Sequence, residues 1–195
     1  QESMTNYFNN VVRTCEDILP DLNGFMSDLP QDKAKKKKAV NNFLNLLKDK
    51  QCTESDEYAM LIDTIISIDN SVDAALAKAD LLKVKKKYKA SLEVLRTALE
   101  MADNDTLKGD IKLGILEIQY TNLSSYKSAY NTAMSINGSN RSKALMVASN
   151  CVAKLANTCG SSTFDRKCNY YYAAQLATKA GESNLAAKYR ESCPT

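Results

Sequence analysis

The chain has 195 residues, a length that suits one well-buried domain or two small ones. Its six glycines and three prolines are too few turn residues for a fold made of many short strands, which argues against an all-β protein. A net charge of +3 gives no global attraction to nucleic acid, and the absence of histidine excludes histidine-based catalytic triads and zincin motifs.

Three amphipathic helices are predicted in the first 70 residues, where apolar residues recur with the helical period. Pro20 is expected to end the first helix and to open a loop that runs to the start of the second. Thr53 or Ser55 is expected to cap the third, and Ser71 the fourth. The predicted helices cover residues 8–19, 33–47 and about 55–68.

From Ser71 onward, helices are predicted to come in pairs that are joined by short polar turns. The pattern predicts an all-α fold of about nine or ten helices, either an irregular bundle or a short solenoid. Residues 1–70 form an N-terminal three-helix part and residues 71–195 a paired-helix part, together in one compact domain. The later predicted helices cover residues 71–84, 88–102, 107–121, 124–136, 142–158, 164–180 and 183–192.

The paired part resembles the tetratricopeptide-repeat family over about residues 71–136, with a further trace towards residue 192. The resemblance rests on a tyrosine that opens the second helix of a pair and on small residues that alternate with large ones. It implies stacked helical hairpins that act as a protein-binding scaffold. The residues that carry it are Leu82, Tyr88, Ser91, Leu95 and Ala98 in one pair, and Leu113, Leu116, Tyr120, Tyr126, Ala129, Ala133 and Ile136 in the next.

The six cysteines are predicted to form three disulfides, because their number is even, their spacing is wide and no CxxC pair or histidine offers a metal site. Six buried free thiols in a cytosolic protein are the alternative. Cys151 and Cys159 are excluded as partners, since eight residues of one helix hold them about 12 Å apart. The predicted pairs are Cys15 with Cys52, Cys159 with Cys168, and Cys151 with Cys193.

Disulfides favour an oxidising compartment, so a secreted, extracellular protein is expected. The first 27 residues lack the basic and apolar segments of a signal peptide, as in a mature chain after cleavage. Asn104, Asn137 and Asn140 stand in N-x-S/T sequons within predicted loops and are candidate glycosylation sites.

Two lysine clusters are a candidate surface for an anionic partner such as a heparin-like polysaccharide. A solvated helix face is the competing interpretation. Nucleic acid is disfavoured as a partner, because arginines are few and only Tyr88 lies near a cluster. The clusters consist of Lys35, Lys36, Lys37 and Lys38, and of Lys83, Lys85, Lys86 and Lys87.

Tyr170, Tyr171 and Tyr172 are consecutive and point about 100° apart on a helix, so at least one is expected to be exposed. An exposed tyrosine is a candidate protein contact, because it offers a large rigid ring with a polar tip. A helix with a wide buried face is the competing interpretation.

A small apolar ligand is a further possibility, since helical bundles can open a cavity between their helices. The same side chains are equally suited to form the core of the N-terminal helices. The candidate lining residues are Phe8, Phe25, Met26, Phe43 and Tyr58.

No catalytic, cofactor or metal site is predicted, because no nucleophile elbow, phosphate loop or dinucleotide fingerprint is present. No membrane span is expected either, since Asp63 and Ser67 interrupt the longest apolar run. The expected function is therefore non-enzymatic binding of another macromolecule by a secreted protein. In composition the chain is similar to secreted helical effectors of arthropod saliva or parasites, which implies a host protein, such as a receptor or immune factor, as partner. A carrier of apolar ligands and a binder of anionic polysaccharide are the alternatives.

Overall fold

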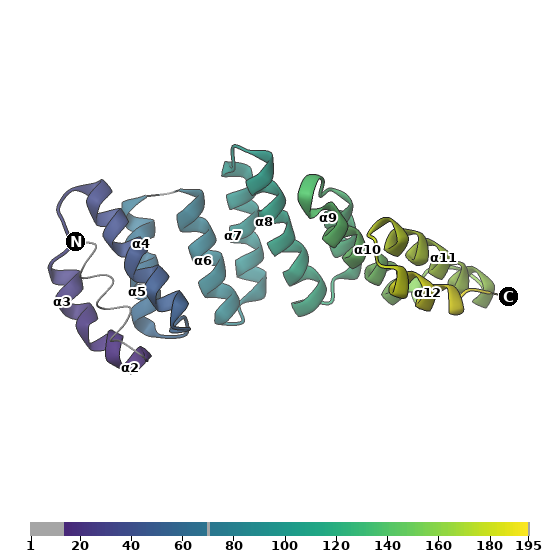
Figure 1. The fold of residues 1–195 in the computed structure, drawn as a ribbon, viewed down its shortest axis with the longest axis horizontal. Coiled ribbons are helices and arrows are strands. Elements are labelled where there is room, and N and C mark those ends of the chain that lie inside the picture. The colour runs from purple at the N-terminus through teal and green to yellow at the C-terminus, as the bar shows by residue number, and fades with distance from the viewer. Residues whose placement is uncertain (1–13, 70, 195) are drawn as a thin grey trace. The chain divides into compact units, whose positions relative to one another are not determined.

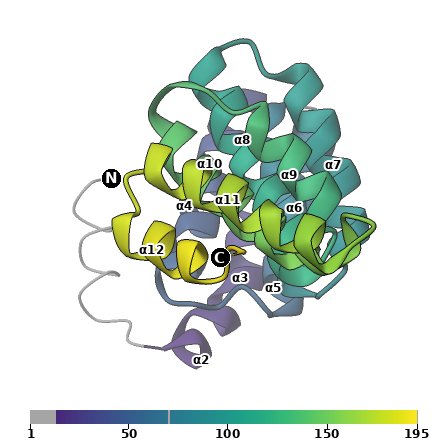
Figure 2. The same ribbon diagram turned by 90° about the vertical axis from the view of Figure 1, so that its right-hand side faces the viewer.

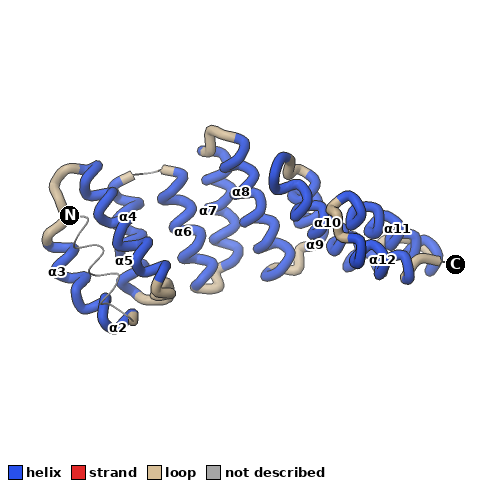
Figure 3. Tube along the Cα trace, in the orientation of Figure 1, coloured by secondary structure: helices blue, strands red, loops and turns tan. Residues whose placement is uncertain are grey.

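The computed structural model describes residues 14–69 and 71–194, and these residues form helices and turns without any strand (Figures 1 and 3). The predicted all-α class is confirmed. The contacts between residues divide the chain into two compact units, with the boundary between Val94 and Leu95. This boundary falls inside helix α7, which spans Tyr88–Met101, so α6 belongs with the helices that precede it.

Unit 1 contains the predicted second, third and fourth helices nearly as expected. The part of the first predicted helix that precedes Thr14 lies outside the described residues. The helices of unit 1 are α2 (Cys15–Ile18), a 3₁₀ turn (Leu19–Asp21), α3 (Leu22–Ser27), α4 (Lys33–Asp49), α5 (Asp56–Ile68) and α6 (Val72–Val84).

The loop predicted after Pro20 is wrong in part, because residues 22–27 form helix α3. Pro20 lies in the first turn of a 3₁₀ helix, where its missing N–H leaves no hydrogen bond unmade. Gly24 lies within α3 and has no neighbouring atom near the position of a Cβ. The buried side chain of Leu22, only 1% exposed, anchors the short helix to the core and outweighs the low helix propensity of glycine.

Side-chain caps fix the starts of the longer helices in unit 1. The hydroxyl of Ser55 accepts a hydrogen bond from the backbone N–H of Tyr58 at 3.1 Å, and Ser71 accepts one from Ala74 at 3.3 Å. Both serines were expected as caps from the sequence, and both are confirmed. They set where α5 and α6 begin, and therefore which faces of these helices meet the core.

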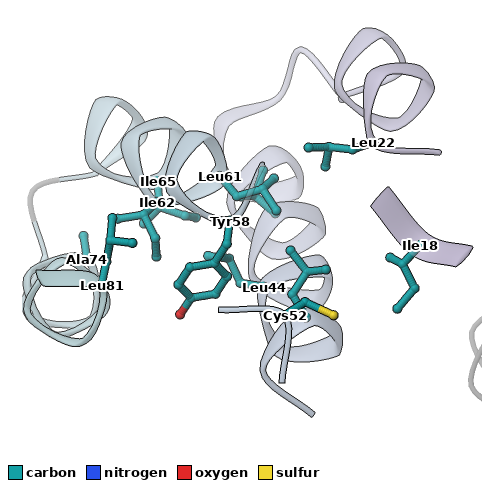
Figure 4. Packing of buried hydrophobic residues seen from close by; sticks show 12 residues of the cluster. Ile18, Leu22, Leu44, Cys52, Tyr58, Leu61, Ile62, Ile65, Ala74 and Leu81 are labelled. Atoms are coloured by element: carbon teal, nitrogen blue, oxygen red, sulfur yellow. The ribbon is translucent and has the colours of Figure 1, made fainter. Parts of the chain in front are cut away.

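The core of unit 1 is formed by aliphatic side chains of α4, α5 and α6 around Tyr58 (Figure 4). The Tyr58 side chain is buried, and its hydroxyl has no hydrogen-bond partner. Burial raises the pKa of Tyr58 to about 12, with a smaller contribution from Asp80. Phe25 and Phe43 stack with ring centroids 4.5 Å apart and pack against this core, as does Met26. These side chains thus contribute to packing, while Phe8 lies outside the described residues.

Unit 2 contains the remaining helices, which pack in chain order (Figures 1 and 2). Small residues let them approach closely: Ala129, Ala133, Ala144 and Ala148 have no exposed surface. The helices are α8 (Asp105–Glu117), a π-helical turn (Ile118–Asn122), α9 (Tyr126–Met134), a 3₁₀ turn (Gly138–Asn140), α10 (Arg141–Leu155), a 3₁₀ turn (Ala156–Thr158), α11 (Thr163–Lys179) and α12 (Ser183–Glu191).

Of the three predicted disulfides, only that between Cys15 and Cys52 is confirmed, with their Cα atoms 5.6 Å apart. It ties the start of α2 to the residue that follows the turn after α4. The predicted pairs Cys151 with Cys193 and Cys159 with Cys168 are wrong, because all four of these residues are free thiols.

The positions of these thiols explain the error. Cys151 is fully buried in the core formed by α8 to α11, whereas Cys193 follows α12 and donates a weak hydrogen bond to the carbonyl oxygen of Tyr189. Cys159 is exposed and ends the turn after α10. Its carbonyl oxygen accepts a hydrogen bond from Asn169, which lies about 100° around α11 from Cys168.

Candidate functional site

Helix α11 carries a row of exposed aromatic side chains along the side that faces away from the core. Phe164, Tyr171 and Tyr172 are 62%, 50% and 40% exposed, and among the residues that the structure describes only Met60 joins them as an exposed large hydrophobic residue. With 100° per residue, the row occupies an arc of about 100°. The row, called here the α11 face, consists of Phe164, Cys168, Tyr171, Tyr172 and Gln175.

The opposite side of α11 is as tightly packed as the α11 face is open. Ala173, Ala174 and Ala177 are at most 2% exposed and pack against Ala186 and Tyr189 of α12. Because small residues occupy this side, α12 approaches α11 closely. The aromatic row is therefore not part of the contact between α11 and α12.

Hydrogen bonds hold two of the exposed tyrosines in place. The hydroxyl groups of Tyr172 and Tyr130 lie 2.7 Å apart, and the two rings meet edge to face with centroids 6.4 Å apart. Burial and this hydrogen bond raise the pKa of Tyr130 to about 12. The hydroxyl of Tyr171 donates a hydrogen bond to the carbonyl oxygen of Pro194 at 3.2 Å. The rings are thus partly ordered before any partner binds.

Tyr170 has a different environment from its two neighbours. Its ring lies 6.2 Å from that of Tyr189, whose hydroxyl donates a 2.6 Å hydrogen bond to Asn150. Burial raises the pKa of Tyr189 to about 12. The prediction that at least one tyrosine of the run 170–172 is exposed is confirmed for Tyr171 and Tyr172, while Tyr170 is half-buried.

A capping box and a glycine fix the backbone at the start of α11, where Phe164 lies. Ser162 and Asp165 form a capping box, in which each side chain accepts a hydrogen bond from the other residue's backbone N–H. Hydrogen bonds from Ser161 and Ser162 lower the pKa of Asp165 below its ordinary value. Gly160 has a φ of +121°, and a Cβ there would lie 2.7 Å from the Cβ of Asp165, so only glycine fits.

A polar surface pocket of about 420 Å³ lies between the start of α11 and the end of α12. Its charged and hydroxyl groups do not suit a purely apolar ligand. It is lined by Asn157, Thr163, Arg166, Lys167, Tyr170, Glu191 and Ser192.

The two lysine clusters lie at opposite ends of the helices of unit 1. Helix α5 packs against both α4 and α6, so α4 and α6 run in the same direction (Figure 1). The cluster Lys35 to Lys38 is at the start of α4, where Lys37 pairs with Asp69 at the end of α5. The cluster Lys83 to Lys87 is at the end of α6. The start and the end of a helix of this length are about 20 Å apart. The clusters therefore do not form one continuous patch.

Two of the three candidate glycosylation sites use their side chains within the fold. Asn104 caps α8, where its oxygen accepts a 2.8 Å hydrogen bond from Leu107. The amide of Asn140 donates to Asp110 at 2.8 Å. Asn137 is exposed in the turn before residues 138–140.

No group of three or more aspartate, glutamate, cysteine or histidine residues in the described ranges is arranged to hold a metal ion. Within those same ranges, no helix combines the length and the apolar character that crossing a bilayer requires. Comparisons with known protein families, with curated proteins and with solved structures find no match.

The α11 face is only partly predictable from the sequence. The tyrosine run was identified, but Phe164 was missed as part of the same surface. The sequence does show that Phe164 shares a helix face with Tyr171, because Phe164, Cys168, Tyr171 and Gln175 follow one another at intervals of three or four residues. The buried alanines follow the same period, so the spacing alone does not tell which side of the helix faces the core.

Proposed function

We propose that this chain is an extracellular, non-enzymatic binding protein that engages a partner protein through the α11 face. The observation that carries the proposal is the row of Phe164, Tyr171 and Tyr172 on one exposed side of one helix. Scattered exposed hydrophobic residues are ordinary on a protein surface, whereas three large ones on a single side are typical of an interaction site.

The surroundings of the α11 face fit a protein interface. Polar and charged residues of the same helix, among them Asp165, Lys167 and Lys179, flank the aromatic row. Aromatic side chains at the centre of a polar rim are the usual source of binding energy in such interfaces. The hydrogen bonds of Tyr171 and Tyr172 reduce the entropy that binding has to remove from these side chains. The partner is expected to present an apolar patch about 17 Å long, the rise from Phe164 to Gln175.

Two further considerations support the extracellular setting and the binding role. The disulfide between Cys15 and Cys52 is typical of oxidising compartments. The resemblance to tetratricopeptide repeats, inferred from the sequence, implies a scaffold for protein binding. A secreted effector that acts on a host protein is the broader role in which we place this activity.

Binding of an anionic polysaccharide is a second candidate, favoured by the exposed side chains of Lys85, Lys86 and Lys87 in the turn after α6. Replacing the three lysines by glutamate is expected to abolish retention on a heparin column. The corresponding change of Lys35, Lys36 and Lys38 tests the opposite end of unit 1. Equal loss from both variants indicates a charge effect without a defined site.

The main proposal is tested by photo-crosslinking. A benzophenone amino acid replaces Phe164 in one variant and Met60, which is 40% exposed in unit 1, in a matched control. We expect a discrete adduct with an extracellular protein at position 164 that disappears in the presence of excess unlabelled wild type. An excess of unlabelled protein that carries Phe164→Ser and Tyr171→Ser is expected to leave the yield of this adduct unchanged. Adducts of equal yield and pattern at positions 60 and 164 would contradict the proposal.

A further inference from the structure

Cys168 and Cys193 are two free thiols in the hairpin formed by α11 and α12. The two helices are joined by the turn at residues 180–182 and pack along their length, so the end of α12 lies beside the first half of α11 (Figure 2). The contact between the Tyr170 and Tyr189 rings fixes this register. Cys168 stands two residues before Tyr170, and Cys193 four residues after Tyr189.

A hydrogen bond places the end of the chain on the side of α11 that carries Cys168. Tyr171 follows Cys168 by three residues, so the two side chains are neighbours on the helix surface. The hydroxyl of Tyr171 donates to the carbonyl oxygen of Pro194, the residue directly after Cys193. Cys193 is held in turn by its own weak hydrogen bond to Tyr189. The segment 193–194 therefore lies against Tyr171, the helix neighbour of Cys168.

The electrostatics of the two thiols agree with this proximity. Burial raises the pKa of Cys193, and the neighbouring Cys168 raises it further. Both side chains are partly exposed, so a small oxidant can reach them. Cys151 is by contrast fully buried in the core, where burial raises its pKa to about 12. It is not available for exchange.

We propose that Cys168 and Cys193 form a disulfide when the protein meets a low-molecular-weight disulfide such as oxidised glutathione. One protein thiolate attacks a glutathione sulfur, forms a mixed disulfide and releases one glutathione. The second protein thiolate then attacks the protein sulfur of the mixed disulfide and releases the other glutathione. Two protein thiols are oxidised, one oxidised glutathione is reduced, and the two protons end on the released thiols.

The new bond closes a covalent loop around the α11 and α12 hairpin and fixes the end of the chain across α11. Such a link stabilises the hairpin by restricting its unfolded state. The inference does not depend on the partner proposed above, although Cys168 lies in the α11 face. Cys159 is the competing partner for Cys168, and it approaches α11 from the side of Asn169.

Peptide mapping tests the proposal directly. The full chain is equilibrated in glutathione buffers of increasing oxidised fraction, its free thiols are alkylated, and it is digested with trypsin without reduction. Cleavage after Lys154, Arg166, Lys167 and Arg190 places Cys151, Cys159, Cys168 and Cys193 in separate peptides. We expect a linked peptide joining residues 168–179 to residues 191–195, with equal loss of alkylation at Cys168 and Cys193.

Two variants serve as controls. Cys159→Ser is expected to leave the link intact, whereas Cys193→Ser is expected to leave Cys168 as a mixed disulfide with glutathione. Circular dichroism of each variant verifies that the helices remain folded. Three results overturn the proposal: a Cys159 to Cys168 link in the wild type, separate glutathione adducts on Cys168 and Cys193, or full alkylation of both in the most oxidising buffer.

Discussion

Breaking the bond between Cys15 and Cys52 tests how unit 1 is held together. The two residues are 37 apart in the sequence, and closing a loop of that length removes about 13 cal/mol/K of entropy from the unfolded chain. At room temperature this corresponds to a stabilisation of about 4 kcal/mol. Because domains of this size are commonly stable by only about 5–15 kcal/mol, the loss is a large share of the total.

Hydrogen exchange measures this loss in each unit separately. In Cys15→Ala the link is absent while Cys52 keeps its buried position, and the double variant with Cys52→Ala removes that side chain as well. Both variants are expected to lower the free energy of opening of the slowest amides in α5 by about 4 kcal/mol. The amides of α10, in unit 2, serve as the internal control. A loss below about 1 kcal/mol in α5, or an equal loss in α10, would contradict a role of this disulfide in stabilising unit 1.

Three further changes test single features of unit 1. Tyr58→Phe removes a buried hydroxyl that has no hydrogen-bond partner. In urea titrations this change is expected to raise the free energy of unfolding by about 1 kcal/mol. A free energy of unfolding lowered by that amount would mean that the hydroxyl is hydrogen-bonded. Lys86 has a φ of +56°, which strains a residue with a side chain, so Lys86→Gly is expected to stabilise the end of α6 by about 1 kcal/mol. An unchanged midpoint of urea unfolding would mean that the backbone at this position is not strained. The hydrogen bond with Lys37 lowers the pKa of Asp69 from 3.8, so the contribution of Asp69 to stability is present above pH 3.8 and is lost as the pH falls through the lowered pKa. Asp69→Asn is expected to remove this acid-dependent part of the stability. Identical profiles of unfolding free energy against pH for variant and wild type would contradict this role of Asp69.

Most of the helices could be predicted because their signals are local. The apolar period of α4 and α5 and the serine caps at Ser55 and Ser71 depend only on neighbouring residues in the chain. Helix α3 was missed, because Pro20 and Gly24 are local signals for a turn and only the burial of Leu22 overrides them. The pair of Cys15 with Cys52 is the one predicted disulfide that is confirmed.

The candidate site depends on packing between helices, which a single helix does not encode. On α11 the alanines and the aromatic residues follow the same period, and the close packing of α12 against the alanines decides which side is buried. For the same reason the predicted pairs of Cys159 with Cys168 and of Cys151 with Cys193 could not be tested against the packing of α10, α11 and α12. The separation of the two lysine clusters likewise follows from the directions of α4 and α6.

The affinity of the crosslinked partner, once it is purified, tests the role of the α11 face most directly. Phe164→Ser and Tyr171→Ser are each expected to weaken binding at least about tenfold, the usual effect of removing an aromatic anchor from the centre of an interface. Met60→Ser removes an exposed hydrophobic residue from unit 1 and is expected to leave the affinity unchanged. If both α11 variants bind within about twofold of the wild type, or if Met60→Ser weakens binding as much as they do, the α11 face is not the binding surface.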